Sequence, residues 1–283
     1  MTCYSAGCDG KLRQWNVSQP PTSAAVIGQH DAPIKAVKFL PQSNLVVTGS
    51  WDRTLRLWDC RSPNAVATAQ LSERVNAMDA RQTAVVVGTA DKMLHVFDLS
   101  AGLNRVANYK SPIDHQTRTV SIFADCKGFA LGAIEGRIAI EHFSEMSKKI
   151  ASDPSYKIPG TPNFIFKYHR DKRNDNGYDI YSVNCIGFHP TMNTFCTAGS
   201  DGSWAMWDKD GRTKLRAFDA HKNKCPIATV AFAPKGNLMF YAPSYDWSRG
   251  AEANNGVSLT LADFCRVLYV LLFNVACFVI LLL

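Results

Sequence analysis

A short turn that ends in an acidic residue recurs along this chain of 283 residues and constrains its fold more than any other feature. In each copy, small or polar residues precede the acid and an apolar segment precedes them. The successive acids are separated by 43, 39, 44, 66 and 45 residues, and most of these intervals match the roughly 40–45-residue period of a propeller blade. The acids are Asp9, Asp52, Asp91, Glu135, Asp201 and Asp246.

An aromatic residue follows the acid at a fixed distance in several copies. Six residues after the acid stands Trp15, Trp58, Phe97 or Trp207, and the next residue is Asn or Asp. Between the turn and the aromatic the chain alternates between apolar and polar residues, as in 54–58, which is typical of a half-buried strand. The repeated unit is therefore strand, acidic turn, strand and aromatic-Asp. It predicts an all-β fold, a WD-repeat β-propeller.

The residue types of the repeat suit a buried hydrogen-bond network. A His that enters the blade, a Ser or Thr on the next strand, the turn acid and the strand Trp can satisfy one another. In this chain His30, Thr48, Asp52 and Trp58 make up a full set. Two further histidines precede their own turns at similar distances, and we expect structural roles for them: His115 and His221.

The blade count predicts an incomplete propeller. Residues 1–253 supply about five to six blades, because the first unit lacks its first strand and the sixth ends after its turn. Residues 254–263 form a linker, and 264–283 form a tail in which 18 of 20 residues are apolar. We expect this tail to be helical. Its uncharged part, 267–283, is at the lower limit for a membrane anchor, and the alternative is a non-native extension that replaces the closing strand.

Composition and motifs argue against an enzyme or a metal protein. The chain carries a net charge of +7, and it contains no G-x-S-x-G, H-E-x-x-H or P-loop motif. Cys3 and Cys8 lack a second pair of ligands, so no zinc site is predicted. No catalytic residue, metal or cofactor is therefore expected.

The long interval between Glu135 and Asp201 carries about 22 extra residues, placed roughly at 143–177. Basic and aromatic residues alternate there, a mixture that suits single-stranded nucleic acid because cations neutralise phosphates and rings stack on bases. The alternative is a solvated loop whose aromatics pack on the propeller edge. The residues concerned are Lys148, Lys149, Lys157, Lys167, Arg170, Lys172, Arg173, Tyr156, Phe164, Phe166 and Tyr168.

Four short stretches of the chain carry a family resemblance: Gln-His-Asp-Ala-Pro at 29–33, Ile-Glu-Gly-Arg at 134–137, Trp-Asp-Lys-Asp at 207–210 and Ser-Tyr-Asp-Trp-Ser at 244–248. They resemble the mRNA export factor family, the Gle-type WD-repeat proteins of the nuclear pore, and the resemblance covers about residues 1–253. The stretches at 207–210 and 244–248 distinguish this family from the related spindle-checkpoint WD protein.

The resemblance implies a seven-bladed, non-enzymatic scaffold that docks a hairpin motif (the GLEBS segment) of an FG-nucleoporin and contacts single-stranded RNA or mRNP. It implies a location in the nucleus, at the nuclear envelope and pore, with a cytoplasmic shuttling pool. Carried to matching positions, the RNA- or partner-binding residues are Arg137, Phe166, Trp207, Lys209 and Arg212. Trp207 is also a blade-core aromatic by its place in the repeat, so its role stays open.

Two other hypotheses remain at this stage. The first is a protein-only adaptor, linked to the spindle checkpoint or the ubiquitin pathway, that binds peptides on the propeller face. The second is a propeller tethered to a membrane by residues 264–283.

Overall fold

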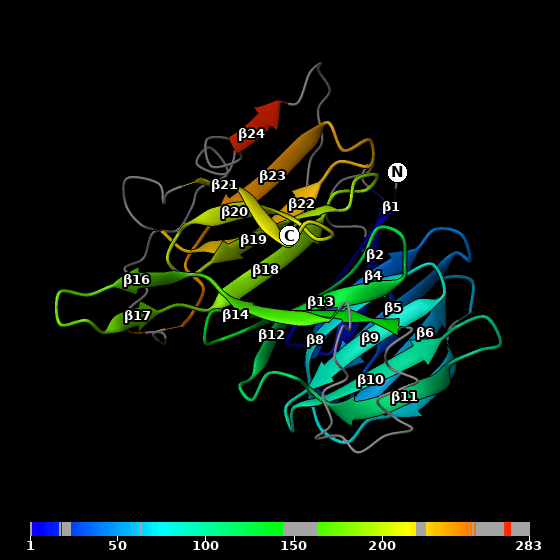
Figure 1. Cartoon of the computed structure of the whole chain (residues 1–283). Helices are drawn as coiled ribbons and strands as arrows, with labels where there is room; N and C mark the ends of the chain where they lie inside the picture. Colours follow the sequence, from blue (N-terminus) through cyan, green and yellow to red (C-terminus); the bar gives the residue numbers. More distant parts are fainter. Residues whose placement is uncertain are drawn as a thin grey trace. The chain divides into compact units, whose positions relative to one another are not determined.

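The computed structural model describes residues 2–16, 18, 24–62, 64–143, 163–218, 225–248, 250, 252 and 269–272. It divides into two compact units. The described part of unit 1 comprises residues 2–122 and 142–143, and that of unit 2 comprises 123–141, 163–248, 250, 252 and 269–272, with the gaps given above. Antiparallel sheets make up both units (Figure 1). This architecture, with its repeats, confirms the predicted all-β WD-repeat β-propeller fold.

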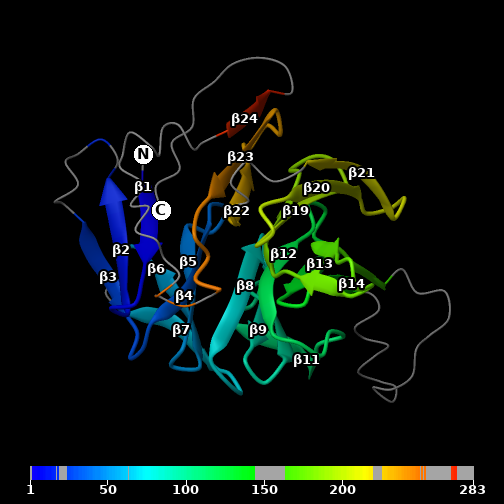
Figure 2. The ribbon, with the colours of Figure 1, turned by 90° about the vertical axis from the view of Figure 1, so that its left-hand side faces the viewer.

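Unit 1 begins with a sheet of three strands, which lie side by side in Figure 2. They are β1 (Thr2–Ala6), β2 (Lys11–Asn16) and β3 (Ala25–Gln29). The Asp9 turn joins β1 to β2, so β1 occupies the second-strand position of a blade. Leu12 of β2 is fully buried and packs with Ile34, Val46 and Trp58.

Two four-stranded sheets follow in unit 1, each in simple sequential order. Their third strands alternate apolar residues inward, and Leu55, Leu57, Leu94 and Val96 are each at most 3% exposed. The strands are β4 (Ile34–Leu40), β5 (Leu45–Ser50), β6 (Thr54–Asp59), β7 (Ala65–Gln70), β8 (Val75–Arg81), β9 (Ala84–Thr89), β10 (Met93–Asp98) and β11 (Asn104–Lys110). Strand β12 (Thr117–Ile122) ends the unit.

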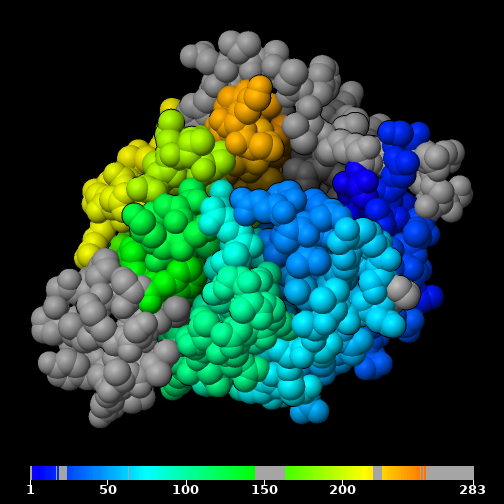
Figure 3. Space-filling model, turned by 90° about the vertical axis from the view of Figure 1, so that its right-hand side faces the viewer, coloured from blue at the N-terminus to red at the C-terminus, as the bar shows by residue number. Residues whose placement is uncertain are grey.

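The first strands of successive blades are tied together by Asp79 of β8. The Lys38 ammonium of β4 lies 2.8 Å from one carboxylate oxygen, and the Ile122 backbone N–H of β12 donates to the other at 2.8 Å. The space-filling view shows the residues of these two sheets, coloured blue to turquoise, packed against one another (Figure 3). One carboxylate thus links three neighbouring strands in unit 1.

Unit 2 begins with β13 (Gly128–Ala133), β14 (Arg137–His142) and β15 (Phe164–Lys167), which are neighbours in that order. A two-stranded hairpin, β16 (Arg170–Lys172) and β17 (Tyr178–Ile180), follows at once. The described end of the long interval is therefore regular structure, and its rings pack on the neighbouring sheet. Its residues Lys148, Lys149, Tyr156 and Lys157 lie outside the described residues.

The next sheet of unit 2 has four strands, and the last has three. The strands are β18 (Val183–Phe188), β19 (Thr194–Gly199), β20 (Trp204–Asp208), β21 (Thr213–Phe218), β22 (Ile227–Phe232), β23 (Leu238–Pro243) and β24 (Tyr269–Leu272). The final acid, Asp246, accepts hydrogen bonds from Ser200 and from the Asn184 amide, the latter at 3.0 Å.

The apolar tail differs from the expected helix where it is described. Residues 269–272 form β24, which pairs antiparallel with β23 from Leu238↔Leu272 to Tyr241↔Tyr269. The helix predicted for the tail is therefore wrong for these four residues, because an apolar segment beside an open strand edge gains backbone hydrogen bonds there. Among the residues that the structure describes, no helix combines the length and the apolarity needed to cross a membrane.

Candidate functional site

The predicted set in the second repeat forms one continuous hydrogen-bond network. His30 Nδ1 lies 2.8 Å from Asp52 Oδ2, and His30 Nε2 lies 2.7 Å from the Thr48 hydroxyl, which also accepts the Trp58 indole N–H at 2.7 Å. Burial raises the pKa of Asp52, but hydrogen bonds from Thr54 and His30 lower it more, so the net pKa lies below its ordinary value. The network pins the turn to the strands on both sides of it.

A second full network lies in unit 2. His169 Nδ1 is 3.0 Å from both oxygens of Asp201, His169 Nε2 is 3.2 Å from the Thr197 hydroxyl, and the Trp207 indole N–H donates to that hydroxyl at 3.0 Å. Sequence reasoning missed His169. The spacings Thr to Asp and Asp to Trp match those of the second repeat, but the β16–β17 hairpin places the histidine 32 residues before the acid instead of 22.

The third repeat uses different residues for the same purpose. His95 of β10 is fully buried, and its Nε2 lies 3.0 Å from the Ser72 hydroxyl. Desolvation, followed by the positive charge of Arg105, lowers the pKa of His95 to about 4. His115 lies in the segment before β12 and its side chain is exposed, so its predicted place in a buried network is wrong. His221 lies outside the described residues.

Trp207 and Phe166, two of the predicted binding residues, pack against each other in unit 2. Trp207 is only 9% exposed, and its ring centroid lies 4.6 Å from that of Phe166 and 4.9 Å from that of Tyr168. Its indole N–H donates a hydrogen bond to the Thr197 hydroxyl. The structure therefore assigns Trp207 to the blade network, and Phe166 is half-buried on top of it.

Lys209 and Arg212 lie in the turn between β20 and β21, which Asp208 stabilises. The Asp208 carboxylate accepts the backbone N–H groups of Asp210 and Gly211, each at 3.0 Å. Lys209 is only 6% exposed; its ammonium pairs with Asp210 and stands 5.0 Å from the Phe123 ring centroid. This burial does not suit a direct contact with a ligand.

Arg212 adopts a left-handed backbone conformation (φ 51°) and is exposed on the turn. Its guanidinium carbon stands 4.9 Å from the Phe164 ring centroid. Two residues further along, the Lys214 ammonium stands 5.4 Å from the Tyr168 ring centroid. Each cation therefore stands above an aromatic ring, that of Phe164 in β15 or that of Tyr168 directly after it, an arrangement that contributes roughly 0.5–1 kcal/mol at an exposed site. We call Arg212, Lys214, Phe164, Phe166 and Tyr168 the cation–aromatic surface.

A β-bulge decides which cations of β21 join this surface. The register passes from Trp207↔Lys214 to Met206↔Arg216, so Leu215 is the extra residue on β21. Because Met206 and Trp207 are neighbours in β20, their partners point to opposite faces of the sheet. Lys214 lies with Trp207 and Tyr168, whereas Arg216 lies on the other face, above Phe218 at 4.8 Å.

Arg137 does not belong to the cation–aromatic surface. It is the cross-strand partner of Lys167, whereas Phe166 pairs with Ile138, so Arg137 and Phe166 point to opposite faces of the β14–β15 pair. Arg137 Nε lies 3.3 Å from the Glu135 carboxylate. The structure thus brings Phe166, Trp207 and Arg212 together and places Arg137 with Lys167 elsewhere in unit 2.

Within the described residues, no group of three or more His, Cys, Asp or Glu side chains is arranged to hold a metal ion. In the two full networks, His30 with Asp52 and His169 with Asp201 are engaged with one another and with hydroxyl groups.

The fold and the blade networks place this chain in the class of WD-repeat proteins. The model of the WD domain, G-beta repeat, matches residues 22–59 and 175–208, which include both full Thr, Asp and Trp sets. With 40% identity over 260 residues, the chain is similar to the mRNA export factor of Xenopus tropicalis, and the match covers 89% of this chain and 67% of that protein. The chain belongs to the mRNA export factor family of WD-repeat proteins.

Two more relatives show the same extent of similarity. The mRNA export factor GLE2 of Chaetomium thermophilum is 38% identical over 252 residues, covering 88% of this chain and 66% of that protein. Protein Rae1 of Drosophila melanogaster is 38% identical over 260 residues, covering 89% and 70%. The chain therefore spans about two thirds of the length of the curated relatives it matches.

Proposed function

We propose that this protein is a non-enzymatic scaffold in mRNA export that contacts single-stranded RNA through its cation–aromatic surface. Relatives named mRNA export factor and a fold without a catalytic motif support the class of function. The observation that carries the RNA contact is the pair Arg212 and Lys214, which stand above the rings of Phe164 and Tyr168.

The proposed RNA contact depends on cations that stand next to aromatic rings in the cation–aromatic surface. Arg212 and Lys214 are exposed and neutralise phosphates, and the rings of Phe164 and Tyr168 hold the cations in place from below. The half-buried Phe166 lies between Phe164 and Tyr168 along the chain, and we assign it a contact with a base. Trp207 and Lys209, named from the sequence, act beneath this surface as supports.

The proposal includes a docking partner and a location. By family resemblance, the partner is an FG-nucleoporin with a GLEBS hairpin motif, and Arg137, on a different face from Phe166, is the residue we assign to that contact. The location that follows is the nucleus and the nuclear pore, with a shuttling pool in the cytoplasm. The net charge of +7 is in keeping with an RNA-facing protein.

The test is a salt titration of oligoadenylate binding with the double variant Arg212→Gln, Lys214→Gln. For single strands each lost phosphate contact reduces the slope of log K against log salt by about 0.7, so the double variant should lose about 1.4. Arg216→Gln is the matched control: it removes one charge from the same strand on the opposite face and should leave the slope nearly unchanged.

Equal slopes for the wild type and the double variant would overturn the RNA assignment. A pulldown then distinguishes the remaining hypotheses. Recovery of a GLEBS-containing nucleoporin supports the export scaffold, whereas recovery of spindle-checkpoint or ubiquitin-pathway proteins alone supports a peptide-binding adaptor.

A further inference from the structure

The β16–β17 hairpin carries opposite charge character on its two faces. In its register Arg170 pairs with Ile180, Asp171 with Asp179, and Lys172 with Tyr178. Because cross-strand partners and alternate residues share a face, one face carries Arg170, Lys172, Tyr178 and Ile180, and the other carries the two aspartates.

The acidic face is balanced within the hairpin. The Arg173 guanidinium lies 2.7 Å from Asp175 and 3.5 Å from Asp179. The opposite face combines two cations with two exposed apolar side chains, since Tyr178 is 55% and Ile180 is 48% exposed. Such a face suits a ligand that has both a negative charge and a flat apolar part.

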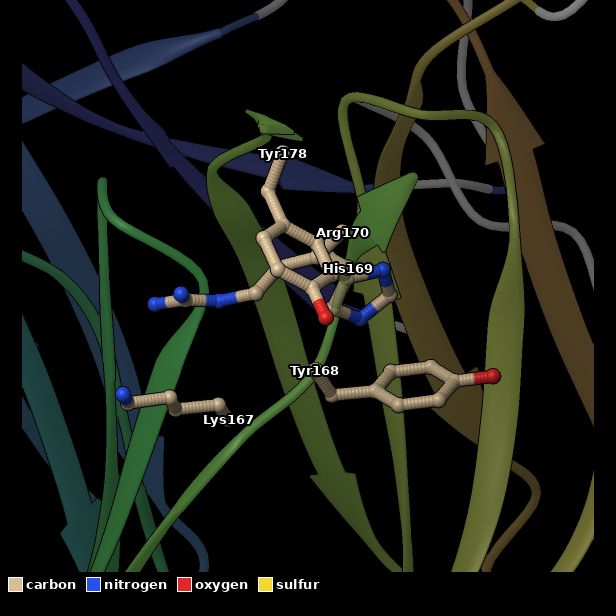
Figure 4. Close-up of a pocket in the computed structure, with 5 residues that line it drawn as sticks. All are labelled: Lys167, Tyr168, His169, Arg170 and Tyr178. Carbon is tan, nitrogen blue, oxygen red and sulfur yellow. The ribbon is translucent and has the colours of Figure 1, made fainter. Parts of the chain in front are cut away.

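A pocket of about 370 Å³ opens where this face meets the end of β15. Five residues line it: Lys167, Tyr168, His169, Arg170 and Tyr178. Figure 4 shows the charged ends of Lys167 and Arg170 on one side of the pocket and the Tyr168 ring on the other. The lining contains no carboxylate. The volume is at the lower end of the range for small-molecule sites, about 300–1,000 Å³.

Hydrogen bonds hold the walls of the pocket in place. The Tyr168 backbone N–H donates to Gly136 at 2.8 Å, and the Tyr181 N–H donates to the His169 carbonyl at 3.0 Å. The Arg170 guanidinium donates to the Glu135 carbonyl at 2.9 Å, which fixes its direction. His169 is itself held by Thr197 and Asp201. The site is thus built on the blade network and does not depend on the hairpin alone.

We propose that this pocket binds one unstacked nucleotide of a single-stranded RNA, with the base on the Tyr178 ring and the phosphate between Lys167 and Arg170. A nucleoside monophosphate unit matches the two halves of the lining, one cationic and one aromatic. Tyr168 belongs both to the pocket and to the cation–aromatic surface, whereas Lys167 lies on the opposite face of β15 from Phe166, so a strand bound along Arg212 and Lys214 would pass the end of β15 to enter the pocket. The inference therefore rests on the proposed RNA-binding function.

The test is a calorimetric titration of the full chain with AMP, with adenosine and inorganic phosphate as partial probes. AMP should bind more tightly than either probe. Tyr178→Ala should weaken AMP binding about tenfold through loss of stacking, and Tyr178→Phe should retain it. Lys167→Gln should weaken AMP binding but leave adenosine binding unchanged.

The outcomes separate this inference from the function on which it rests. If AMP does not saturate the protein while oligoadenylate binding and its salt slope stay intact, the pocket assignment is overturned and the RNA scaffold stands. If neither ligand binds, the proposed function falls and the pocket assignment with it. Preferential binding of a phosphotyrosine peptide over AMP would also overturn the nucleotide assignment. A similar loss in Tyr178→Ala and Tyr178→Phe would contradict the stacking geometry.

Discussion

The hydroxyl of Thr197 is the junction of the network in unit 2, and its removal should destabilise the protein strongly. Thr197 is fully buried and joins His169 Nε2, 3.2 Å away, to the Trp207 indole N–H, 3.0 Å away. Thr197→Val keeps the shape and the β-branch but deletes both interactions. Each buried polar group left without a partner costs about 1–3 kcal/mol, so two such groups should cost about 2–6 kcal/mol together.

The measurement is urea unfolding at pH 7 followed by far-UV circular dichroism, which does not depend on Trp207 as a fluorescent reporter. The same substitution at exposed Thr68 of β7 is the control, and it should stay within about 0.5 kcal/mol of the wild type. Thr48→Val should match Thr197→Val, because Thr48 joins His30 and Trp58 in the same way.

A double-mutant cycle isolates the Trp207 interaction. In a Trp207→Phe background the indole N–H is absent, so Thr197→Val should cost about 1 kcal/mol less than in the wild type. If Thr197→Val were no more damaging than Thr68→Val, the network would not stabilise the fold, and the physical account of the repeat would be refuted.

Two further predictions concern a glycine and a histidine. Gly136 has φ 67°, and a Cβ there would overlap the Tyr168 carbonyl oxygen, so Gly136→Ala should lower the free energy of unfolding by about 1–3 kcal/mol. Gly102→Ala, with φ 96° and open space around it, should cost less, and equal losses would contradict the overlap. The pKa of His95 is lowered in the fold from 6.5 to about 4, so its contribution to stability is present above pH 6.5 and is lost as the pH falls toward 4. His95→Gln should flatten that part of the stability profile, and an unchanged profile would show that another group is responsible.

The blade network was largely predictable from the sequence because its spacings are local. A turn acid and an aromatic six residues later share one hairpin, and a Thr four residues before the acid is their neighbour across it. His30 could be found in this way. His169 could not, because the inserted hairpin lengthens the distance to its acid, and only the fold shows that both histidines reach the same place.

The structure buries some of the predicted binding residues and exposes others, for a physical reason. Residue type indicates charge or aromaticity, but the exposed fraction depends on what packs above the side chain. Lys209 and Trp207 are covered by their neighbours, whereas Arg212 is exposed. The position of Lys214 above the Tyr168 ring was not predicted, because it depends on the packing of residues 164–168 against β20 and β21.

By itself, the sequence determined the repeat, the all-β fold, the turn acids with their Trp partners, and the family. The repeat and its turn acids with their Trp partners depend on contacts within one blade, where spacing along the chain sets the geometry. The tertiary structure decided which cations share a surface, through the bulge at Leu215 and the pairing of Arg137 with Lys167. It also decided that residues 269–272 pair with β23 as a strand. A one-residue shift in register reverses the direction of every side chain that follows, and such a shift cannot be inferred from composition.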